Sequence, residues 1–198
     1  MRLSEIDRGD SVKARLLIRF ISLVSGMRLP DAARVAFYHE NFLSAALGAW
    51  TQRAMRGPSA WSVAERELMA AMVAKWNACP FCVGAHSAVA AKSIPRLVIE
   101  AVLADYRSAP IPAPLKGTLA FLEIMTLRPA ELSAEHAAAA RRAGATAAAL
   151  EDAAAVAAVF AIITRYADAL DFALPSAAEF DRAATMLLKR GYGRSRPT

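Results

Sequence analysis

The sequence predicts an all-α protein, built as a bundle of packed helices in a single domain. Apolar residues recur with the period of an α-helix over most of the chain, and the alternation typical of a strand is hard to find. Hydrophobic residues make up 56% of the 198 residues, and there are only 9 glycines and 10 prolines. This composition favours a packed core over a disordered chain. The length suits one domain.

Sequence signals mark many of the expected helix boundaries. Ser62-Val63-Ala64-Glu65 and Ser176-Ala177-Ala178-Glu179 are capping boxes, in which serine and glutamate satisfy backbone N–H groups at a helix start. Pro95, Pro129 and Pro175 lie where one helix should end and the next begin, because proline breaks a helix interior. The expected helices span residues 11–25, 31–55, 63–77, 80–92, 95–106, 113–127, 134–143, 147–172 and 177–190.

We expect one domain over residues 1–198. Residues 1–30 form an N-terminal extension in this scheme. Residues 191–198 form a flexible basic tail, since a charged chain end is normally frayed and solvated. The proline-rich segment 108–114 is a stiff connector, but no low-complexity linker or repeat divides the chain.

Charge and hydropathy narrow the classes of function. The 24 basic and 18 acidic residues give a net charge of +6, but no groove-reading motif accompanies them, so we expect no nucleic-acid partner. No apolar run resembles a signal peptide or approaches the roughly 20 residues of a membrane span. We therefore expect a cytoplasmic protein without a membrane partner. In that reducing compartment a C-x-x-C is more often catalytic or metal-binding than a structural disulfide.

The most informative stretch carries Glu67, Cys79, Cys82 and His86 in the pattern E-x11-C-x2-C-x3-H. The two cysteines are the only ones in the chain. If a helix starts at Cys79, Pro80 takes its first position, where the missing N–H costs nothing. Cys79, Cys82 and His86 then lie on one helix face, within about 60° of one another. The spacing therefore predicts two thiols and an imidazole side by side.

This arrangement suits redox or nucleophilic chemistry. Both cysteines lie in the first helical turn, where free N–H groups and the helix dipole stabilise a thiolate. Capping geometry favours Cys79 as the better stabilised thiolate, whereas the histidine four residues later favours Cys82. Glu67 shares its helix face with alanines, so we expect it to be buried, with a pKa raised by desolvation. We expect its neighbour Arg66 to be solvated.

Other interpretations stay open at this point. The cysteines could be small buried apolar residues, and the histidine beside them a hydrogen-bonded core residue. All four residues of the pattern could bind structural zinc, although such sites favour two separated ligand pairs. We expect no metal and no cofactor. Among other polar residues, nothing places His39 at the site, His136 fits a solvated first turn, and Arg165 and Asp168 fit an intrahelical ion pair.

The pattern and its surroundings resemble the AhpD-like alkylhydroperoxidases of the carboxymuconolactone decarboxylase superfamily, and in particular its peroxidase-related branch. The resemblance rests on Ala64–Leu68, on Cys79–Ser87 and on the late helix Phe160–Leu170. It implies an AhpD-like helical bundle that assembles as a homo-oligomer (dimer, trimer or hexamer) and carries out thiol peroxidase chemistry.

By the same resemblance, Cys82 attacks the peroxide, Cys79 resolves the product, and Glu67 and His86 relay the proton. One position departs from the family pattern. Phe81 stands inside the C-x-x-C where active relatives carry a histidine, so the relay has one member fewer.

The sequence thus predicts a thiol-dependent alkyl hydroperoxide reductase in antioxidant defence. A hydroperoxide would be its substrate, and a lipoyl-type or thioredoxin-like protein would supply the dithiol that regenerates it. The alternatives are a dithiol disulfide reductase or redox-sensing protein without efficient peroxidase turnover, and a metal-binding structural module.

Overall fold

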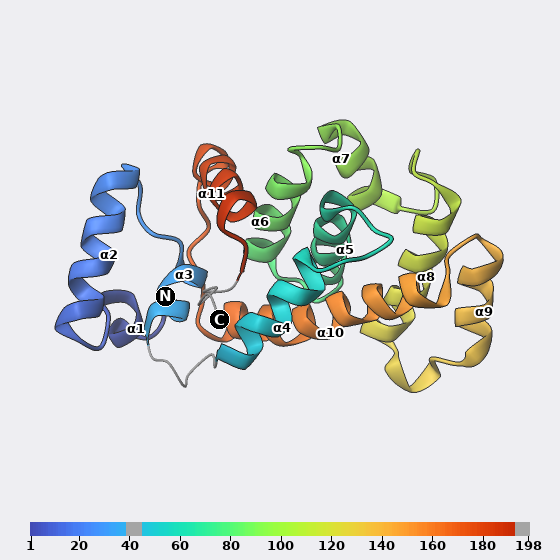
Figure 1. Ribbon diagram of the computed structural model, residues 1–198, viewed down its shortest axis with the longest axis horizontal. Coiled ribbons are helices and arrows are strands. Elements are labelled where there is room, and N and C mark those ends of the chain that lie inside the picture. Colours follow the sequence, from blue (N-terminus) through green and yellow to red (C-terminus); the bar gives the residue numbers. More distant parts are fainter. Residues whose placement is uncertain (39–44, 193–198) are drawn as a thin grey trace.

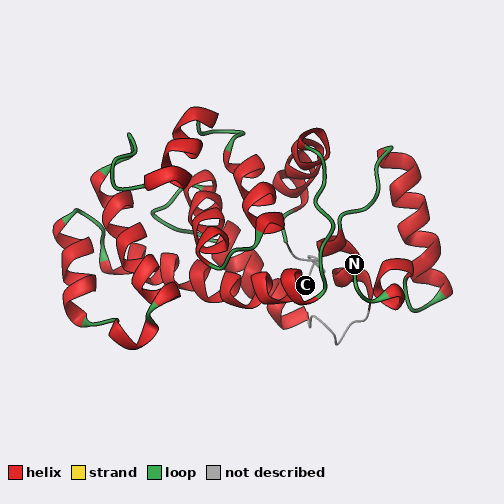
Figure 2. Cartoon of the chain, turned by 180° about the vertical axis from the view of Figure 1, so that it is seen from behind, coloured by secondary structure: helices red, strands yellow, loops and turns green. Residues whose placement is uncertain are grey.

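The computed structural model describes residues 1–38 and 45–192, and these residues form helices and loops without a strand (Figure 1, Figure 2). The all-α class predicted from the sequence is therefore confirmed. The helical elements are α1 (Ser4–Arg8), α2 (Val12–Ser25), α3 (Asp31–Tyr38), α4 (Ala45–Arg56), α5 (Val63–Trp76), α6 (Pro80–Ala90), α7 (Arg96–Asp105), α8 (Ala113–Leu127), the 3-10 turn η1 (Pro129–Glu131), α9 (Ala134–Arg142), α10 (Ala147–Ala169) and α11 (Ala177–Arg190).

Most observed helix ends lie within two residues of those expected, and the differences have local causes. The expected helix 31–55 is found as α3 and α4, and residues 39–44 between them lie outside the described part of the chain. α10 ends three residues early because Asp171 takes a left-handed conformation with φ 55°. The N–H of Phe172 then reaches the carbonyl of Ala167 at 3.0 Å, which is a Schellman ending. The sequence interpretation omits α1 and η1.

α5 is the central helix of the bundle. Ten of its 14 residues are buried, so it is enclosed by neighbours instead of presenting one apolar stripe. It lies beside α6 and contacts α10 and α8 (Figure 1). Trp61, just before α5, donates its indole N–H to the carbonyl of Ala149 at 2.7 Å, which ties the start of α5 to α10. Full burial of a side chain such as Leu68 or Met69 contributes about 1.5–3 kcal/mol.

α10 is long and apolar enough to cross a membrane by length and composition alone. In the bundle it packs against α4, α5 and α8, and nine of its residues are buried, Phe160 among them. Its Asp152 accepts a hydrogen bond from Ser59 at 2.6 Å. These contacts make α10 a core helix of the bundle.

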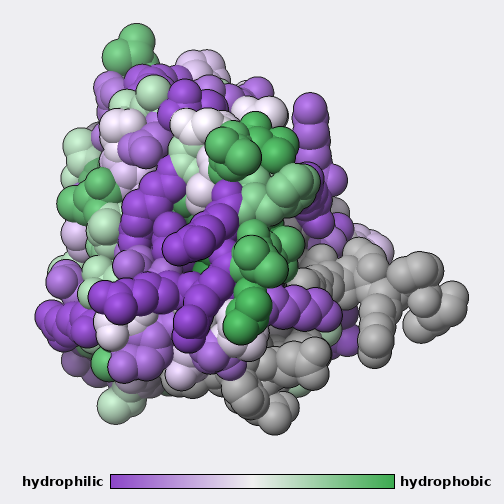
Figure 3. Space-filling model, turned by 90° about the vertical axis from the view of Figure 1, so that its left-hand side faces the viewer, coloured by the Kyte–Doolittle hydropathy of each residue, from purple (hydrophilic) through white to green (hydrophobic). Residues whose placement is uncertain are grey.

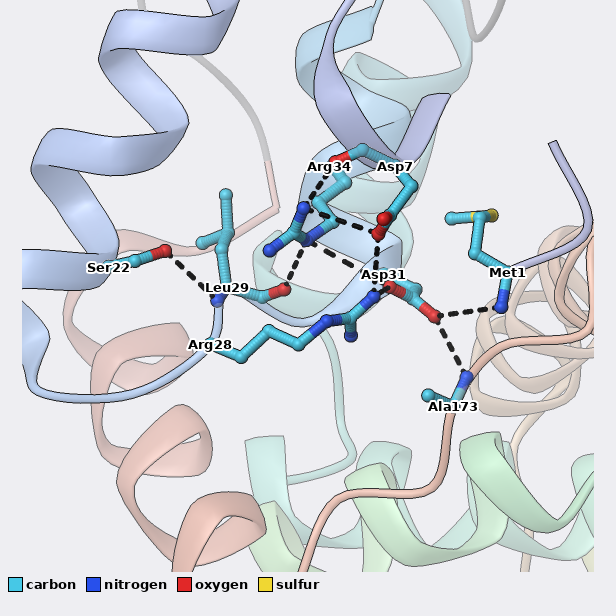
Figure 4. A network of polar contacts seen from close by, with 8 residues as sticks. All are labelled: Met1, Asp7, Ser22, Arg28, Leu29, Asp31, Arg34 and Ala173. Carbon is cyan, nitrogen blue, oxygen red and sulfur yellow. Dashed lines mark hydrogen bonds and ion pairs between the residues drawn. The ribbon is translucent and has the colours of Figure 1, made fainter. Parts of the chain in front are cut away.

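A buried carboxylate fixes the N-terminal helices to the rest of the bundle (Figure 4). Asp31, the first residue of α3, is fully buried, and its Oδ1 pairs with Nη2 of Arg28 at 2.6 Å. Its Oδ2 accepts the backbone N–H of Ala173 at 2.8 Å, from the loop between α10 and α11. Arg28 also pairs with Asp7 of α1 at 2.8 Å. The network places α3 against that loop. A single domain with residues 1–30 as an extension stays a prediction.

α2 carries an apolar face that the described part of the chain leaves exposed. Leu16, Phe20, Leu23 and Val24 recur at helical spacing, and each is at least 61% exposed. The opposite side of the helix, which includes Ile18, is buried. Figure 3 shows this side of the molecule, where hydrophobic side chains gather next to strongly hydrophilic ones.

Candidate active site

The two cysteines lie at the junction between α5 and α6, where α6 begins. α5 ends in a Schellman motif, with Ala78 at φ 57° and the N–H of Cys79 bonded to the carbonyl of Ala74 at 2.9 Å. Cys79 is the N-cap of α6, and Pro80 is its first residue. The helix start predicted from the sequence is therefore confirmed. An alanine in the left-handed region costs about 1–2 kcal/mol, so the turn before Cys79 is strained.

Both thiols are buried and unbridged, with Cys79 0% and Cys82 1% exposed. The thiol of Cys82 donates toward the sulfur of Cys79, and this contact lowers the pKa of Cys79 even though burial opposes it. The same contact, together with burial, raises the pKa of Cys82. The carboxylate of Asp168 acts on both thiols in the raising direction. The lower pKa of the pair therefore belongs to Cys79, which loses its proton before Cys82 does.

Glu67 is 0% exposed, so its predicted burial is confirmed, and four elements meet at its carboxylate. Nδ1 of His86 on α6 lies 2.6 Å from its Oε2. Nη2 of Arg56, the last residue of α4, lies 2.7 Å from its Oε1. The hydroxyl of Tyr192, just after α11, donates to Oε1 at 2.9 Å and to Oε2 at 3.1 Å. The carboxylate thus links α4, α5, α6 and the segment after α11.

These partners set the charge of Glu67. Burial acts to raise its pKa, but the hydrogen bond and charge of His86 and the charge of Arg56 outweigh burial, so the pKa lies below the ordinary value. The expectation of a raised pKa is therefore wrong, because it counted burial without the partners. An ionised Glu67 accepts the Nδ1–H of His86. Nε2 then remains as the nitrogen that can exchange a proton with a substrate.

The sequence interpretation misses Tyr192 and Arg56. The tail 191–198 is expected to be flexible, but Tyr192 packs into the site. Its ring lies 4.8 Å from the guanidinium of Arg56, and its backbone N–H donates to Oε1 of Gln52 at 2.7 Å. Residues 193–198 lie outside the described part, so for them the expectation stays untested. The one available signal was an aromatic residue within an otherwise polar, basic segment.

Arg66 requires a second correction, because it is buried and not solvated. Its Nη1 donates to the carbonyl of Ala54 at 3.1 Å and to that of Gly57 at 2.9 Å. These carbonyls belong to the last turn of α4 and the residue that follows it, where no intrahelical donor is available. Arg66 therefore caps the C-terminal end of α4, the helix that carries Arg56.

Phe81, the residue inside the C-x-x-C, belongs to an aromatic cluster. Its ring centroid lies 5.1 Å from that of Phe172 and 5.9 Å from that of Phe180 on α11. Gly84, one turn later on α6, permits the close approach of α11, since a Cβ there would lie 2.6 Å from the Phe180 ring. Phe81 and Gly84 thus dock α11 and the loop before it onto α6.

A cavity of about 390 Å³ opens beside α6. Cys82 and His86 form part of its wall, whereas Cys79 and Glu67 do not. Most of the remaining wall is apolar, and its aromatic members are Phe81, Phe160, Tyr166, Phe172, Phe180 and Tyr192. An apolar cavity with a few polar groups at one place is typical of a small-molecule site. Cys82 is the thiol that a molecule in this cavity can reach.

Of the other polar candidates, Asp168 acts on the thiols, whereas His136 and Arg165 do not join the site. His39 lies outside the described residues. His136 lies in the first turn of α9, where its Nδ1 accepts the N–H of the N-cap serine at 3.1 Å. Within the described part no ion pair joins Arg165 to Asp168, because Arg165 donates to the carbonyl of Ala161. No group of three or more His, Cys, Asp or Glu side chains there is arranged to hold a metal ion.

Comparison with known proteins gives similarity in structure only, since no protein-family model and no curated protein matches the sequence. A peroxidase-related protein from Silicibacter sp. TM1040, described as uncharacterized, is 26% identical with a TM-score of 0.72, over 86% of this chain and 88% of its own. A second such protein, from Ralstonia eutropha JMP134, is described as an alkylhydroperoxidase AhpD core. It is 24% identical with a TM-score of 0.69, over 86% and 88% of the two chains.

A third solved structure is similar over nearly its whole length. It is the debrominase Bmp8 in complex with 2,3,4-tribromopyrrole, which is 18% identical with a TM-score of 0.67, over 89% of this chain and 91% of its own. All three therefore share one helical architecture with this chain, and it extends well beyond the stretch that carries the motif.

Proposed function

Because the chain belongs to the AhpD-like proteins of the carboxymuconolactone decarboxylase superfamily, we propose that it is a thiol-dependent reductase of organic hydroperoxides. One observation carries the proposal. Cys82 and His86 share the wall of an apolar cavity, while Nδ1 of His86 is held by a buried, ionised Glu67. A thiol, an oriented imidazole and a carboxylate together make an activated nucleophile.

The first step places the negative charge on the sulfur that faces the cavity. The two thiols titrate as a pair, so moving their shared proton from Cys82 to Cys79 makes Cys82 the thiolate without creating two adjacent charges. This thiolate attacks the terminal oxygen of R–O–O–H, and the O–O bond breaks. Nε2 of His86 passes the proton of the Cys79 thiol to the departing alkoxide, which leaves as the alcohol. Cys82 is left as a sulfenic acid.

The second step closes the disulfide. The Cys79 thiolate attacks the sulfur of Cys82, the S–O bond breaks, and hydroxide leaves as water after taking a proton from solvent. The lowered pKa of Cys79 supports this role, because the resolving sulfur is then readily ionised. An external dithiol, of the lipoyl type or in a thioredoxin-like protein, would reduce the disulfide and restore the pair.

The test is a stopped-flow reaction of the reduced protein with cumene hydroperoxide, a fatty-acid hydroperoxide and hydrogen peroxide. We expect loss of both titratable thiols with the two organic substrates. Cys79→Ser should stop at a sulfenic acid that dimedone traps on Cys82. His86→Ala should slow the reaction, whereas the control His136→Ala should not. Peroxide consumption by Cys82→Ser at the wild-type rate would show that the nucleophile is misassigned.

The aromatic wall of the cavity favours a second candidate function, the reductive removal of halide from an aromatic ring. The reaction converts an aryl halide and two thiols into the arene, a halide ion, a proton and a disulfide, so both electrons come from the dithiol. Bmp8, which has this fold, is a debrominase. Bromide release from 2,3,4-tribromopyrrole, measured beside hydroperoxide reduction, separates the two candidates. If neither substrate oxidises the dithiol, a disulfide reductase or a redox sensor remains as the function.

We also propose that the protein is a cytoplasmic homo-oligomer and that the exposed face of α2 contacts a second copy of the chain. An uncovered apolar face of this kind marks an association surface, and the resemblance stated above implies a homo-oligomer. Light scattering after gel filtration should give a mass above the 21.2 kDa of one chain. Leu23→Glu should lower that mass, while Leu97→Glu on α7 should not. An unchanged mass in Leu23→Glu would place the interface elsewhere.

A further inference from the structure

We propose that Tyr192 is a positioning residue of the reactive centre, which orients the carboxylate of Glu67 and thereby fixes the tautomer of His86. The inference rests on the proposed function of the dithiol and adds to it a residue outside the sequence motif. Tyr192 lies 125 residues after Glu67 in the sequence and enters the site after α11.

The contacts around the carboxylate assign the proton positions. The Tyr192 hydroxyl oxygen lies 2.9 Å from Oε1 and 3.1 Å from Oε2 of Glu67, and its one proton is donated to this carboxylate. The same hydroxyl lies 3.3 Å from Nδ1 of His86, which itself lies 2.6 Å from Oε2. An ionised carboxylate can only accept, so both the hydroxyl and Nδ1–H donate to it. In the neutral imidazole, the lone pair of His86 then lies on Nε2.

The chain holds Tyr192 in place from three sides. Its backbone N–H donates to Gln52 at 2.7 Å. Gly191 before it has φ 68°, a backbone conformation that favours glycine. The guanidinium of Arg56 lies over the ring of Tyr192 while it pairs with Glu67. These contacts show a specifically placed side chain and not a loosely packed chain end.

The hydroxyl is suited to act as a permanent donor. Burial and the charge of Glu67 raise the pKa of Tyr192 well above its ordinary value, so the phenol keeps its proton wherever the thiols react. Without it, Glu67 would keep Arg56 and His86 but would leave part of its acceptor capacity unmet in a buried place. The carboxylate would then be free to turn, and the Nδ1–H contact would be held for less of the time.

The experiment measures the ionisation of Cys82 without any peroxide. The rate at which iodoacetamide alkylates Cys82 is followed by mass spectrometry from pH 5 to 9, in a Cys79→Ser background. Tyr192→Phe keeps the ring and removes the hydroxyl, and it should slow alkylation at neutral pH about tenfold, the effect of one lost hydrogen bond to a charged group. Gln52→Ala, which does not touch Glu67, should move the rate in the same direction.

The control is Tyr106→Phe, which removes a hydroxyl that donates to Glu123 at 2.6 Å away from the reactive centre. It should leave the alkylation profile unchanged. A Tyr192→Phe profile that coincides with that of the wild type would overturn the proposal. If Tyr192→Phe does not fold, the ¹⁵N spectrum of the wild-type histidines decides, because a His86 with its proton on Nε2 would equally overturn it.

These readouts are separate from the proposed function. A wild-type protein that reduces no hydroperoxide would refute the reductase, yet a slowed alkylation in Tyr192→Phe would still support the positioning role. Conversely, an active peroxidase whose Cys82 is alkylated equally fast in both proteins would refute the role of Tyr192 alone.

Discussion

Replacing Gly84 with alanine is expected to destabilise the protein, although alanine is the better helix former. Gly84 lies in the interior of α6, where the change alone should stabilise by about 0.5–1 kcal/mol. The new Cβ, however, would lie 2.6 Å from Cε2 and 2.7 Å from Cζ of Phe180. Overpacking of this kind costs about 1–3 kcal/mol. The clash should therefore win, with a net loss of about 1 kcal/mol.

Phe180 cannot relieve the clash without cost. If its ring turns away, it leaves Phe81, whose ring centroid is 5.9 Å from its own, and an aromatic pair is worth about 0.5–1.5 kcal/mol. Both rings also line the cavity, so the turn would change the shape of the substrate site. Stability is lowered whether the ring stays and clashes or turns away. If it turns away, the KM for a bulky hydroperoxide should also rise.

The assay is urea unfolding followed by circular dichroism, with Gly48→Ala as the matched control. Gly48 lies inside α4, and a Cβ there would meet only a backbone oxygen of Tyr192 at an ordinary 3.9 Å. The free energy of unfolding of this control should rise by about 0.5–1 kcal/mol. In a parallel thermal unfolding experiment, the melting temperatures of the two variants should differ by roughly 2–4 °C per kcal/mol. If Gly84→Ala is stabilised as much as Gly48→Ala, α11 does not approach α6 as closely as described.

Three further predictions follow from local geometry. Ala78→Gly should raise the unfolding free energy by about 1 kcal/mol, because glycine removes the left-handed strain, whereas Ala91→Gly in a right-handed C-cap should lower it; equal urea midpoints would contradict this. Glu67→Gln should destabilise at neutral pH. Since the folded pKa of Glu67 is lowered, its contribution is present above the ordinary value of 4.5 and is lost as the pH falls through the folded value, so the melting temperatures of variant and wild type should converge in acid. Ser62→Ala should cost about 1 kcal/mol by removing the capping box of α5, and an unchanged melting curve would argue against that cap.

The parts of the fold that the sequence predicts are those set by residues close together in the chain. The capping box at Ser62 acts within four residues, and Pro80 with the N-cap Cys79 acts within one helical turn. These signals place α5 and α6, and with them the common face of the two cysteines and His86. The burial of Glu67 was predictable for the same reason, because the alanines on its face are its neighbours on one helix.

The parts that were missed depend on contacts between distant segments. Arg66 follows the same capping box, yet its burial depends on the end of α4, which no local pattern reveals. The pKa of Glu67 is lowered by His86 on α6 and by Arg56 on α4. Neither residue lies on α5, the helix that carries Glu67, so the local sequence does not reveal the direction of the shift. Tyr192 reaches Glu67 only because α11 packs on α6, so its role could not be inferred from a basic, glycine-containing tail.

The reactive groups and most of the cavity wall come from different segments of the chain. The reactive groups come from one short stretch, residues 67–86, whereas much of the surrounding wall comes from α3, α4, α10 and α11. Wall residues of the outer helices α3, α4 and α11, such as Ala33, Leu47 and Leu187, belong to no cluster that holds the thiols, so they can change the shape of the cavity without altering the reactive groups. Such a protein can acquire a new substrate by drift in its outer helices while its chemistry is inherited unchanged. The same division offers protein engineers a wall to redesign around a reactive centre that stays in place.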